Sequence, residues 1–109
     1  MIFGSADGLA ASGSQYWDQD VSGIADQAET CDNFGFSLSA ADFNADGFKD
    51  LVIGVPNEDI GSEADVGAVH VLYGSMTGLT ADSNQFWTQD SANVEDTSEV
   101  NDWFGFALP

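Results

Sequence analysis

The sequence repeats itself at an offset of 70 residues, and this repetition limits the folds that the chain can adopt. Four short motifs recur at that distance in the same order: Phe3-Gly-Ser5 and Tyr73-Gly-Ser75, Gln15-Tyr-Trp17 and Gln85-Phe-Trp87, Gln19-Asp20 and Gln89-Asp90, Phe34-Gly-Phe36 and Phe104-Gly-Phe106. Residues 1–39 align with residues 71–109 without a gap, and 16 of these 39 positions are identical. Tandem units of this kind bury their cores against one another, so a stacked architecture is expected.

The repeat divides the chain into three parts. We predict that residues 1–33 are the end of one repeat, residues 34–103 a complete repeat, and residues 104–109 the start of the next. Hydrophobic residues make up 43% of the sequence, which is enough for a packed core and argues against disorder.

Each repeat is expected to be all-β. Residues 34–41 alternate between large and small side chains, and residues 51–55 are continuously apolar, as in a strand that is covered on both faces. We expect two further strands at 67–73 and 84–88, separated by loops at 57–65 and 74–83. Four short antiparallel strands per unit predict a β-propeller-type blade, and 109 residues make only an incomplete ring of such blades.

An acidic loop between the first two predicted strands has the spacing of a calcium site. Side-chain oxygens stand at positions 1, 3, 5 and 9 of the loop: Asp42, Asn44, Asp46 and Asp50. Gly47 occupies position 6, where such a loop turns sharply, and Phe48 at position 7 would add its backbone carbonyl. Position 12 is Ile53 rather than the Glu that closes an EF-hand, so we expect a Ca²⁺ loop that joins two strands. An acidic turn held by side-chain hydrogen bonds is the alternative.

The order of these motifs resembles the FG-GAP repeat, the unit of the integrin α-subunit propeller and of many bacterial secreted proteins. The resemblance rests on Phe34-Gly35, the acidic loop, Gly54-Val-Pro56, the strand from Gly67 to Gly74, and Gly78-Leu79. It implies calcium-stabilised propeller blades in an extracellular or cell-surface protein. The sequence departs from the family pattern in reaching Pro109 before a second acidic loop, and it has no Arg-rich face. The ligand specificity of integrins is therefore not carried over.

The composition excludes several classes of function. The chain has 19 acidic residues and one basic residue, Lys49, so its formal net charge is −18. Such a surface repels nucleic acids and anionic membranes. Cys31 is the only cysteine, which rules out an internal disulfide and metal sites built from several cysteines. No apolar run is long enough to insert into a membrane, and the first residues lack the pattern of a signal peptide.

No catalytic centre is expected. His70 and Cys31 have no partners at the spacing of a nucleophilic site, and we expect His70 to be a hydrogen-bonded core or edge residue. Recurrence in both repeats favours packing between blades for Trp17 and Trp87. A second acidic group is expected to be a solvated loop: Asn57, Glu58, Asp59, Glu63 and Asp65. The remaining carboxylates, such as Asp26, Glu29 and Asp32, are also expected in loops.

The sequence thus predicts a calcium-stabilised segment with an adhesion, binding or scaffolding role. Its expected partners are other FG-GAP blades, in the same or in neighbouring chains, and a protein or glycan ligand. Two alternatives stay open. The repeat could be the unit of a self-assembling extracellular filament, because its two ends are equivalent half-repeats. It could also be an accessory propeller of a secreted enzyme whose catalytic domain lies elsewhere.

Overall fold

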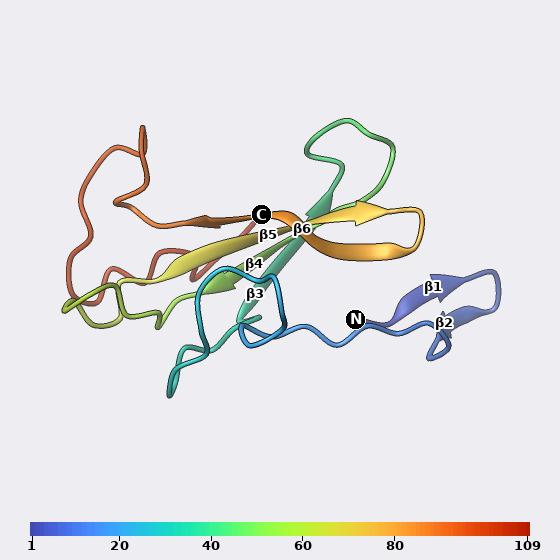
Figure 1. The fold of residues 1–109 in the computed structure, drawn as a ribbon, viewed down its shortest axis with the longest axis horizontal. Helices are drawn as coiled ribbons and strands as arrows, with labels where there is room; N and C mark the ends of the chain where they lie inside the picture. Colours follow the sequence, from blue (N-terminus) through green and yellow to red (C-terminus); the bar gives the residue numbers. More distant parts are fainter.

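Strands account for all the regular secondary structure in the computed structural model, which describes residues 1–109 (Figure 1). The strands are β1 (Phe3–Ser5), β2 (Gly8–Ala10), β3 (Ser37–Ala41), β4 (Asp50–Val55), β5 (Ala68–Ser75) and β6 (Gly78–Trp87). β1 and β2 form a small hairpin, and the other four strands form one antiparallel sheet in the order β3-β4-β5-β6. The sheet does not close on itself, and the prediction of an all-β blade is confirmed. No helix that could cross a membrane is present.

The register of the sheet explains why its central strands are so apolar. Leu51 pairs with Leu72 and Ile53 with His70 across β4 and β5, and all four side chains are buried. The predicted loop at 74–83 is wrong in its extent, because a tight turn at Met76 and Thr77 joins β5 directly to β6. The Ser75 hydroxyl secures this turn by donating a 2.8 Å hydrogen bond to the carbonyl of Gly78.

The sequence repeat is also a repeat of backbone structure. The hydroxyl of Ser5 donates to the carbonyl of Gly8 at 2.8 Å, the bond that Ser75 makes 70 residues later. Oδ1 of Asp20 accepts a hydrogen bond from the amide of Ala28, as Asp90 does from the amide of Ser98. The turns of residues 1–36 therefore match those of residues 71–106, although β2 ends at Ala10 while its counterpart β6 continues to Trp87. The exact boundaries of the repeats, after residues 33 and 103, stay a prediction.

The preceding half-repeat (residues 1–33) covers one face of the four-stranded sheet. Ile24, from that half-repeat, is buried in a cluster with four side chains of the sheet: Leu51, Ile53, Leu72 and Leu79. Trp17 packs against the same cluster, as expected for a residue between blades. The side-chain amide of Gln15 makes two hydrogen bonds of 2.9 Å to the backbone N–H and C=O of Leu79. Apolar burial and paired polar groups thus both hold the half-repeat on the sheet.

Gly54, in the Gly-Val-Pro motif, lies in space against the start of the next repeat (residues 104–109). The hydroxyl of Ser37 donates a 2.6 Å hydrogen bond to the carbonyl of Gly105, and the amide of Phe104 donates to the carbonyl of Val66 at 2.8 Å. A Cβ atom on Gly54 would lie 2.0 Å from the carbonyl oxygen of Gly105, closer than any real contact. The glycine of this motif is therefore required for the start of the next repeat to approach the sheet.

His70 is a core residue, but it is not hydrogen-bonded as expected. The side chain is fully buried, and neither ring nitrogen has a partner. The rings of Phe34 and Phe86 contact the imidazole edge-on, with centroid distances of 5.4 and 4.9 Å. Burial lowers the pKa of His70 to about 4, so the side chain is neutral at pH 7 and behaves as part of the aromatic core.

Candidate calcium site and acidic cluster

The acidic loop connects the end of β3 to the start of β4, and its backbone wraps around its own carboxylates. Asp42, the first residue of the loop, accepts two hydrogen bonds from backbone amides. Oδ1 accepts from Asp46 at 3.1 Å and Oδ2 from Gly47 at 2.9 Å. The backbone at Ala45 and Gly47 has positive φ, of 61° and 93°. These bonds fix the sharp turn that the spacing predicts.

The next two side chains that carry oxygen, Asn44 and Asp46, repeat this pattern on a smaller scale. Oδ1 of Asn44 accepts from the amide of Asp46 at 3.2 Å, and Oδ1 of Asp46 accepts from the amide of Phe48 at 2.9 Å. Both side chains are exposed. Each carbonyl or carboxylate oxygen has two acceptor sites, so these hydrogen bonds leave oxygen lone pairs available for a cation.

Asp50 differs from the other loop carboxylates because it is buried, with only 1% of its surface exposed. Oδ2 accepts a 2.8 Å hydrogen bond from the amide of Phe43, and Oδ1 accepts a 2.9 Å bond from the amide of Gly74. The first of these closes the loop, and the second ties it to β5. Asp50 therefore connects the loop to the hairpin of β5 and β6.

The atoms of the loop fit a hard divalent cation. The donors are carboxylate, amide and backbone carbonyl oxygens, with no nitrogen or sulfur among them, and this set favours Ca²⁺ or Mg²⁺ over transition metals. The carboxylate oxygens of Asp42, Asp46 and Asp50 do not all lie within 4.8 Å of one another. A different group of three carboxyl groups does meet this distance. Calcium binding by Asp42, Asn44, Asp46, Phe48 and Asp50 stays a prediction.

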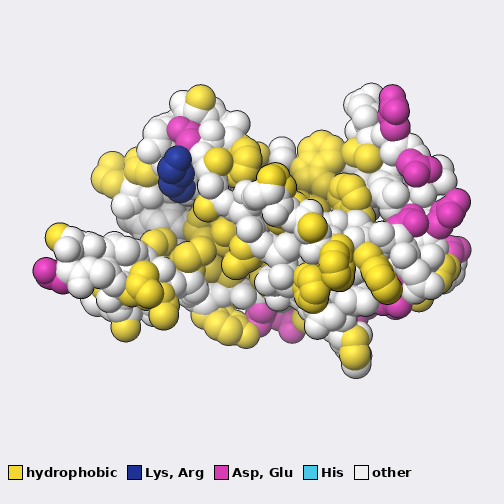
Figure 2. Space-filling view, turned by 180° about the vertical axis from the view of Figure 1, so that it is seen from behind, with side chains coloured by type: hydrophobic (Ala, Val, Ile, Leu, Met, Phe, Trp, Pro, Cys, Tyr) yellow, Lys and Arg dark blue, Asp and Glu magenta, His cyan; other side chains and the backbone are white.

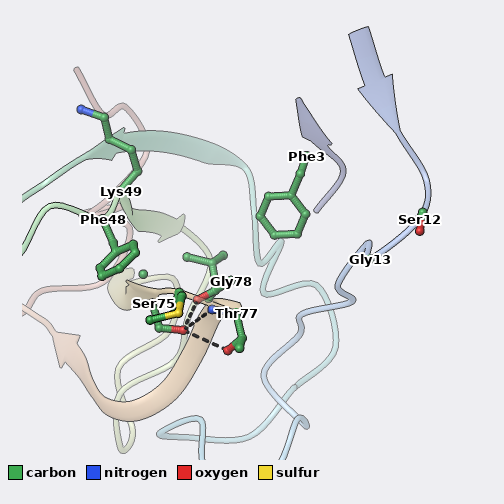
Figure 3. A pocket seen from close by; sticks show the side chains of 11 residues that line it. Phe3, Ser12, Gly13, Phe48, Lys49, Ser75, Thr77 and Gly78 are labelled. Carbon is green, nitrogen blue, oxygen red and sulfur yellow. Dashed lines mark hydrogen bonds between the residues drawn. The ribbon is translucent and has the colours of Figure 1, made fainter. Parts of the chain in front are cut away.

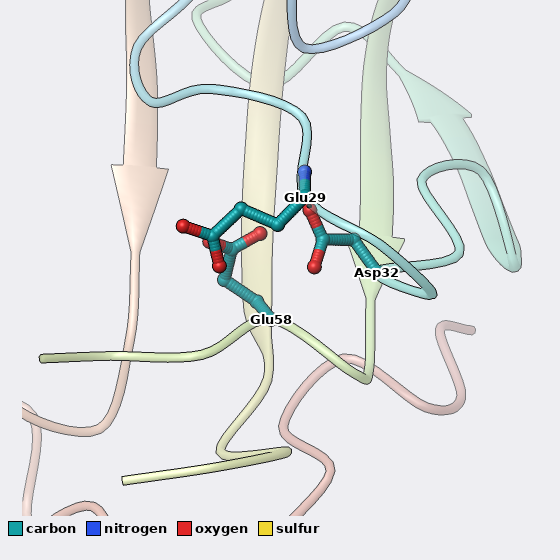
Figure 4. Close-up of side chains that lie close together, drawn as sticks. All are labelled: Glu29, Asp32 and Glu58. Carbon is teal, nitrogen blue, oxygen red and sulfur yellow. Dashed lines mark hydrogen bonds between the residues drawn. The ribbon is translucent and has the colours of Figure 1, made fainter. Parts of the chain in front are cut away.

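That different cluster consists of Glu29, Asp32 and Glu58, whose carboxyl oxygens all lie within 4.8 Å of one another (Figure 4). Glu29 and Asp32 belong to the preceding half-repeat, and Glu58 follows β4. Glu58 is 1% exposed and Asp32 is 3% exposed. Glu58 is therefore not a solvated loop carboxylate, contrary to expectation, whereas Asp32 lies in a loop as expected but is buried. The loop after β4 contacts the preceding half-repeat, because the amide of Asn57 donates a 3.3 Å hydrogen bond to the carbonyl of Asp32.

Burial makes the cluster hold a proton at neutral pH. Burial, followed by the neighbouring carboxyl group of Asp26, raises the pKa of Glu58 to about 9. Burial also raises the pKa of Asp32, against a hydrogen bond from the amide of Glu29 that lowers it. Glu58 is thus uncharged at pH 7, and its Oε2 accepts a 2.6 Å hydrogen bond from Nε2 of Gln19. Glu29 and Asp32 recur as Glu99 and Asp102, and in both pairs the amide of the Glu donates to Oδ2 of the Asp, so the recurrence signals this local turn rather than the buried cluster.

Comparison with known proteins agrees with the architecture. Residues 34–72 match the sequence model of the FG-GAP repeat. The chain is also similar to phosphatidylinositol-glycan-specific phospholipase D from Bos taurus, with 33% identity over 96 residues, and from Rattus norvegicus, with 35% identity over 66 residues. These alignments cover 75% and 61% of the chain, but only 11% and 8% of the relatives.

The chain therefore spans about a tenth of the length of the curated relatives that it matches. No solved structure matches it. The matched segment contains the Phe-Gly pair, the acidic loop, β3 and β4 in full, and most of β5. Sequence match and antiparallel sheet together identify residues 34–72 as an FG-GAP repeat.

Proposed function

We propose that the chain is a calcium-stabilised, non-catalytic FG-GAP segment with a binding or scaffolding role in an extracellular protein. The observation that carries this proposal is the acidic loop, in which backbone amides hold the side chains of Asp42, Asn44 and Asp46 around one turn. A loop shaped in this way needs little further ordering to bind a cation, which favours binding.

The role of the cation would be structural. Asp42, Asn44, Asp46 and the carbonyl of Phe48 would hold it, with Asp50 at the base of the loop. Ca²⁺ would balance the charge of the three carboxylates, which Lys49 alone does not. Through the bond from the amide of Gly74 to Asp50, the loop would also stabilise the β5–β6 hairpin. The formal net charge of −18 opposes compaction, and a bound cation reduces that repulsion.

An extracellular location agrees with the affinity proposed for the loop. Calcium sites in extracellular modules have dissociation constants on the order of 0.1–1 mM, and a loop with three carboxylates, of which only Asp50 is buried, suits that range. The expected partners are further blades of the same or a neighbouring chain. Support for this comes from Gly54, which leaves room for the start of the next repeat, and from the half-repeat that covers the opposite face. We also expect the segment to bind a protein or glycan ligand.

One alternative has a specific observation in its favour. The relatives with 33–36% identity are all phosphatidylinositol-glycan-specific phospholipases D. We infer as the second candidate that the segment is an accessory part of a secreted enzyme, with the catalytic residues outside these 109 residues. The filament alternative rests only on the equivalence of the two half-repeats.

Thermal unfolding in calcium and in chelator tests the calcium proposal. We expect calcium to raise the melting temperature of the chain, and Asp46→Ala to abolish that rise. Asp82→Ala is the matched control, because Asp82 is an exposed carboxylate of β6 outside the loop. Equal melting temperatures of the native chain in calcium and in chelator would contradict the proposal.

A further inference from the structure

A cavity of about 420 Å³ opens beside the acidic loop, between the preceding half-repeat and the β5–β6 hairpin. Its volume lies in the lower part of the range of ~300–1,000 Å³ that small-molecule sites occupy. Four parts of the chain form its walls: Phe3 in β1, Ser12 and Gly13 after β2, Phe48 and Lys49 in the acidic loop, and the segment from Gly74 to Leu79. The cavity shares Phe48 with the proposed calcium loop, but none of the loop's carboxylates lines it.

Aromatic rings form two of the walls. Figure 3 shows the rings of Phe3 and Phe48 on opposite sides of the turn residues Ser75, Thr77 and Gly78. Phe48 is 38% exposed although it is a large apolar residue. It lies close to β5 because Gly74 has no side chain: a Cβ atom on Gly74 would be 3.0 Å from the Cβ of Phe48 and 2.2 Å from the carbonyl oxygen of Lys49.

Hydroxyl groups form the polar part of the wall. Oγ of Ser75 and Oγ1 of Thr77 lie 3.2 Å apart, and Ser75 also donates to the carbonyl of Gly78. Ser12 lines the cavity from the preceding half-repeat. A hydroxyl group donates one hydrogen bond and accepts two. Ser12 and Thr77 can therefore bond both donors and acceptors of a ligand.

The cavity is free of negative charge, although the chain has 19 acidic residues. No carboxylate lines it, and Lys49 is its only charged residue. Figure 3 shows the Lys49 side chain pointing away from Phe3 and Phe48. Figure 2 shows most of the visible acidic side chains at the end of the molecule opposite the single basic side chain. The walls of the cavity carry the aromatic rings of Phe3 and Phe48, the apolar side chains of Met76 and Leu79, and hydroxyl groups, a lining that suits a neutral ligand with apolar faces.

We propose that this cavity binds a neutral sugar ring. The C–H faces of the sugar pack against Phe3 and Phe48, and its hydroxyl groups bond to Ser12 and Thr77. A ring with apolar faces and a hydroxylated edge matches both kinds of wall, whereas an apolar side chain of a protein partner leaves the hydroxyl groups unused. The inference rests on the proposed binding role, since it names the ligand class, but it does not require calcium.

Titration of the full chain with the methyl glycosides of glucose, galactose, mannose and N-acetylglucosamine tests this inference. We expect saturation-transfer NMR to detect contact between protein aromatic protons and the ring protons of at least one glycoside at millimolar concentration. Phe48→Leu and Phe3→Leu should each weaken binding about tenfold, a change of about 1.4 kcal/mol, because each removes a stacked aromatic face. Thr77→Val, on an exposed turn, should weaken it through the lost hydroxyl without changing the fold.

Phe43→Leu is the matched control, because Phe43 is in the same loop, is 54% exposed and does not line the cavity. It should leave sugar binding unchanged. Absence of contact with all four glycosides overturns the inference, as does binding that none of the three cavity substitutions weakens. Binding of N-acetyl-phenylalanine amide without binding of any glycoside also overturns it, in favour of a peptide ligand.

The same samples separate this inference from the calcium proposal. Phe3→Leu changes no residue of the acidic loop, so the calcium-dependent rise in melting temperature should persist in that variant. A chain that responds to calcium but binds no glycoside contradicts only the sugar site. A chain that binds glycosides with equal melting temperatures in calcium and chelator contradicts only the calcium proposal.

Discussion

Nε2 of Gln19 donates a 2.6 Å hydrogen bond to Oε2 of Glu58 across the junction between the preceding half-repeat and the sheet. Both side chains are buried, with 2% and 1% of their surface exposed. Since Glu58 keeps its proton at neutral pH, the junction contains a neutral carboxyl group rather than a carboxylate. Its contribution to stability therefore depends on pH.

The free energy of unfolding should fall as the pH rises from 6.5 to 9. The pKa of Glu58 is about 9 in the folded state against 4.5 for an ordinary glutamate, so in this window the folded state binds a proton that the unfolded state has released. The lowered pKa of His70 has the opposite effect, but only between about pH 4 and 6.5. Urea unfolding at pH 6.5 and pH 9 measures the change, expected to be at most a few kcal/mol.

Glu58→Gln is the control for this pH dependence. The amide of glutamine is neutral at every pH, and its carbonyl oxygen still accepts the hydrogen bond from Gln19. The variant should therefore lose most of the decline between pH 6.5 and 9. An unchanged decline would mean that other carboxyl groups cause it, with the buried Asp32 the first to consider.

Gln15→Ala should weaken the packing of the half-repeat on the sheet. Gln15 makes both hydrogen bonds to the backbone of Leu79, and Leu79 is buried. Loss of partners for a buried backbone N–H and C=O costs about 1–3 kcal/mol, which urea unfolding can measure. Gln85→Ala is the matched control, because Gln85 is the equivalent residue 70 positions later, is exposed, and bonds only to its neighbour Trp87. Equal losses in the two variants would contradict the assignment.

The fold was predictable from local pattern. The alternation of residues 34–41 and the apolar run of 51–55 lie within or overlap β3 and β4, and these two patterns depend on neighbours in sequence. The repeat adds the turns that residues 1–36 share with residues 71–106. The start of β6 was missed because Gly74 to Ser83 is rich in turn-forming residues, although only Met76 and Thr77 make the turn.

The acidic cluster was missed for a different reason. Glu29, Asp32 and Glu58 come together only when the preceding half-repeat packs on the sheet, and no spacing rule links positions that far apart. The surroundings of His70 were also not predictable from local sequence. Its place inside a strand was predictable, but it contacts the rings of Phe34 and of Phe86 in the adjacent strand instead of hydrogen-bond partners.

Gly54→Ala should lower the free energy of unfolding more than the same substitution at another glycine in a strand. The added Cβ would lie 2.0 Å from the carbonyl oxygen of Gly105 and 2.2 Å from Oγ of Ser37, so the start of the next repeat must move away. Overpacking of this kind costs about 1–3 kcal/mol. Gly4→Ala is the control, because Gly4 also lies in a strand and a Cβ atom added there would meet no other atom within 4 Å. Urea unfolding of both variants should separate them, and equal stabilities would contradict the close approach.

Asp50 and Asp46 should respond differently to substitution by asparagine, because one is buried in backbone hydrogen bonds and the other is exposed. Asp46→Asn removes one carboxylate from the loop and should reduce the stabilisation by calcium, while stability in chelator changes little. Asp50→Asn puts an NH₂ group in place of one acceptor oxygen, opposite the amide of Phe43 or of Gly74. This variant should lose about 1–3 kcal/mol even in chelator.

Unfolding of both variants in calcium and in chelator distinguishes the two roles. Asp82→Asn is the control for loss of a carboxylate outside the loop, and it should behave like the native chain in both conditions. If Asp50→Asn were as stable as the native chain in chelator, the two hydrogen bonds would not hold the loop to β5. If Asp46→Asn kept the full calcium response, Asp46 would not be a calcium ligand, and the loop would act only as a hydrogen-bonded turn.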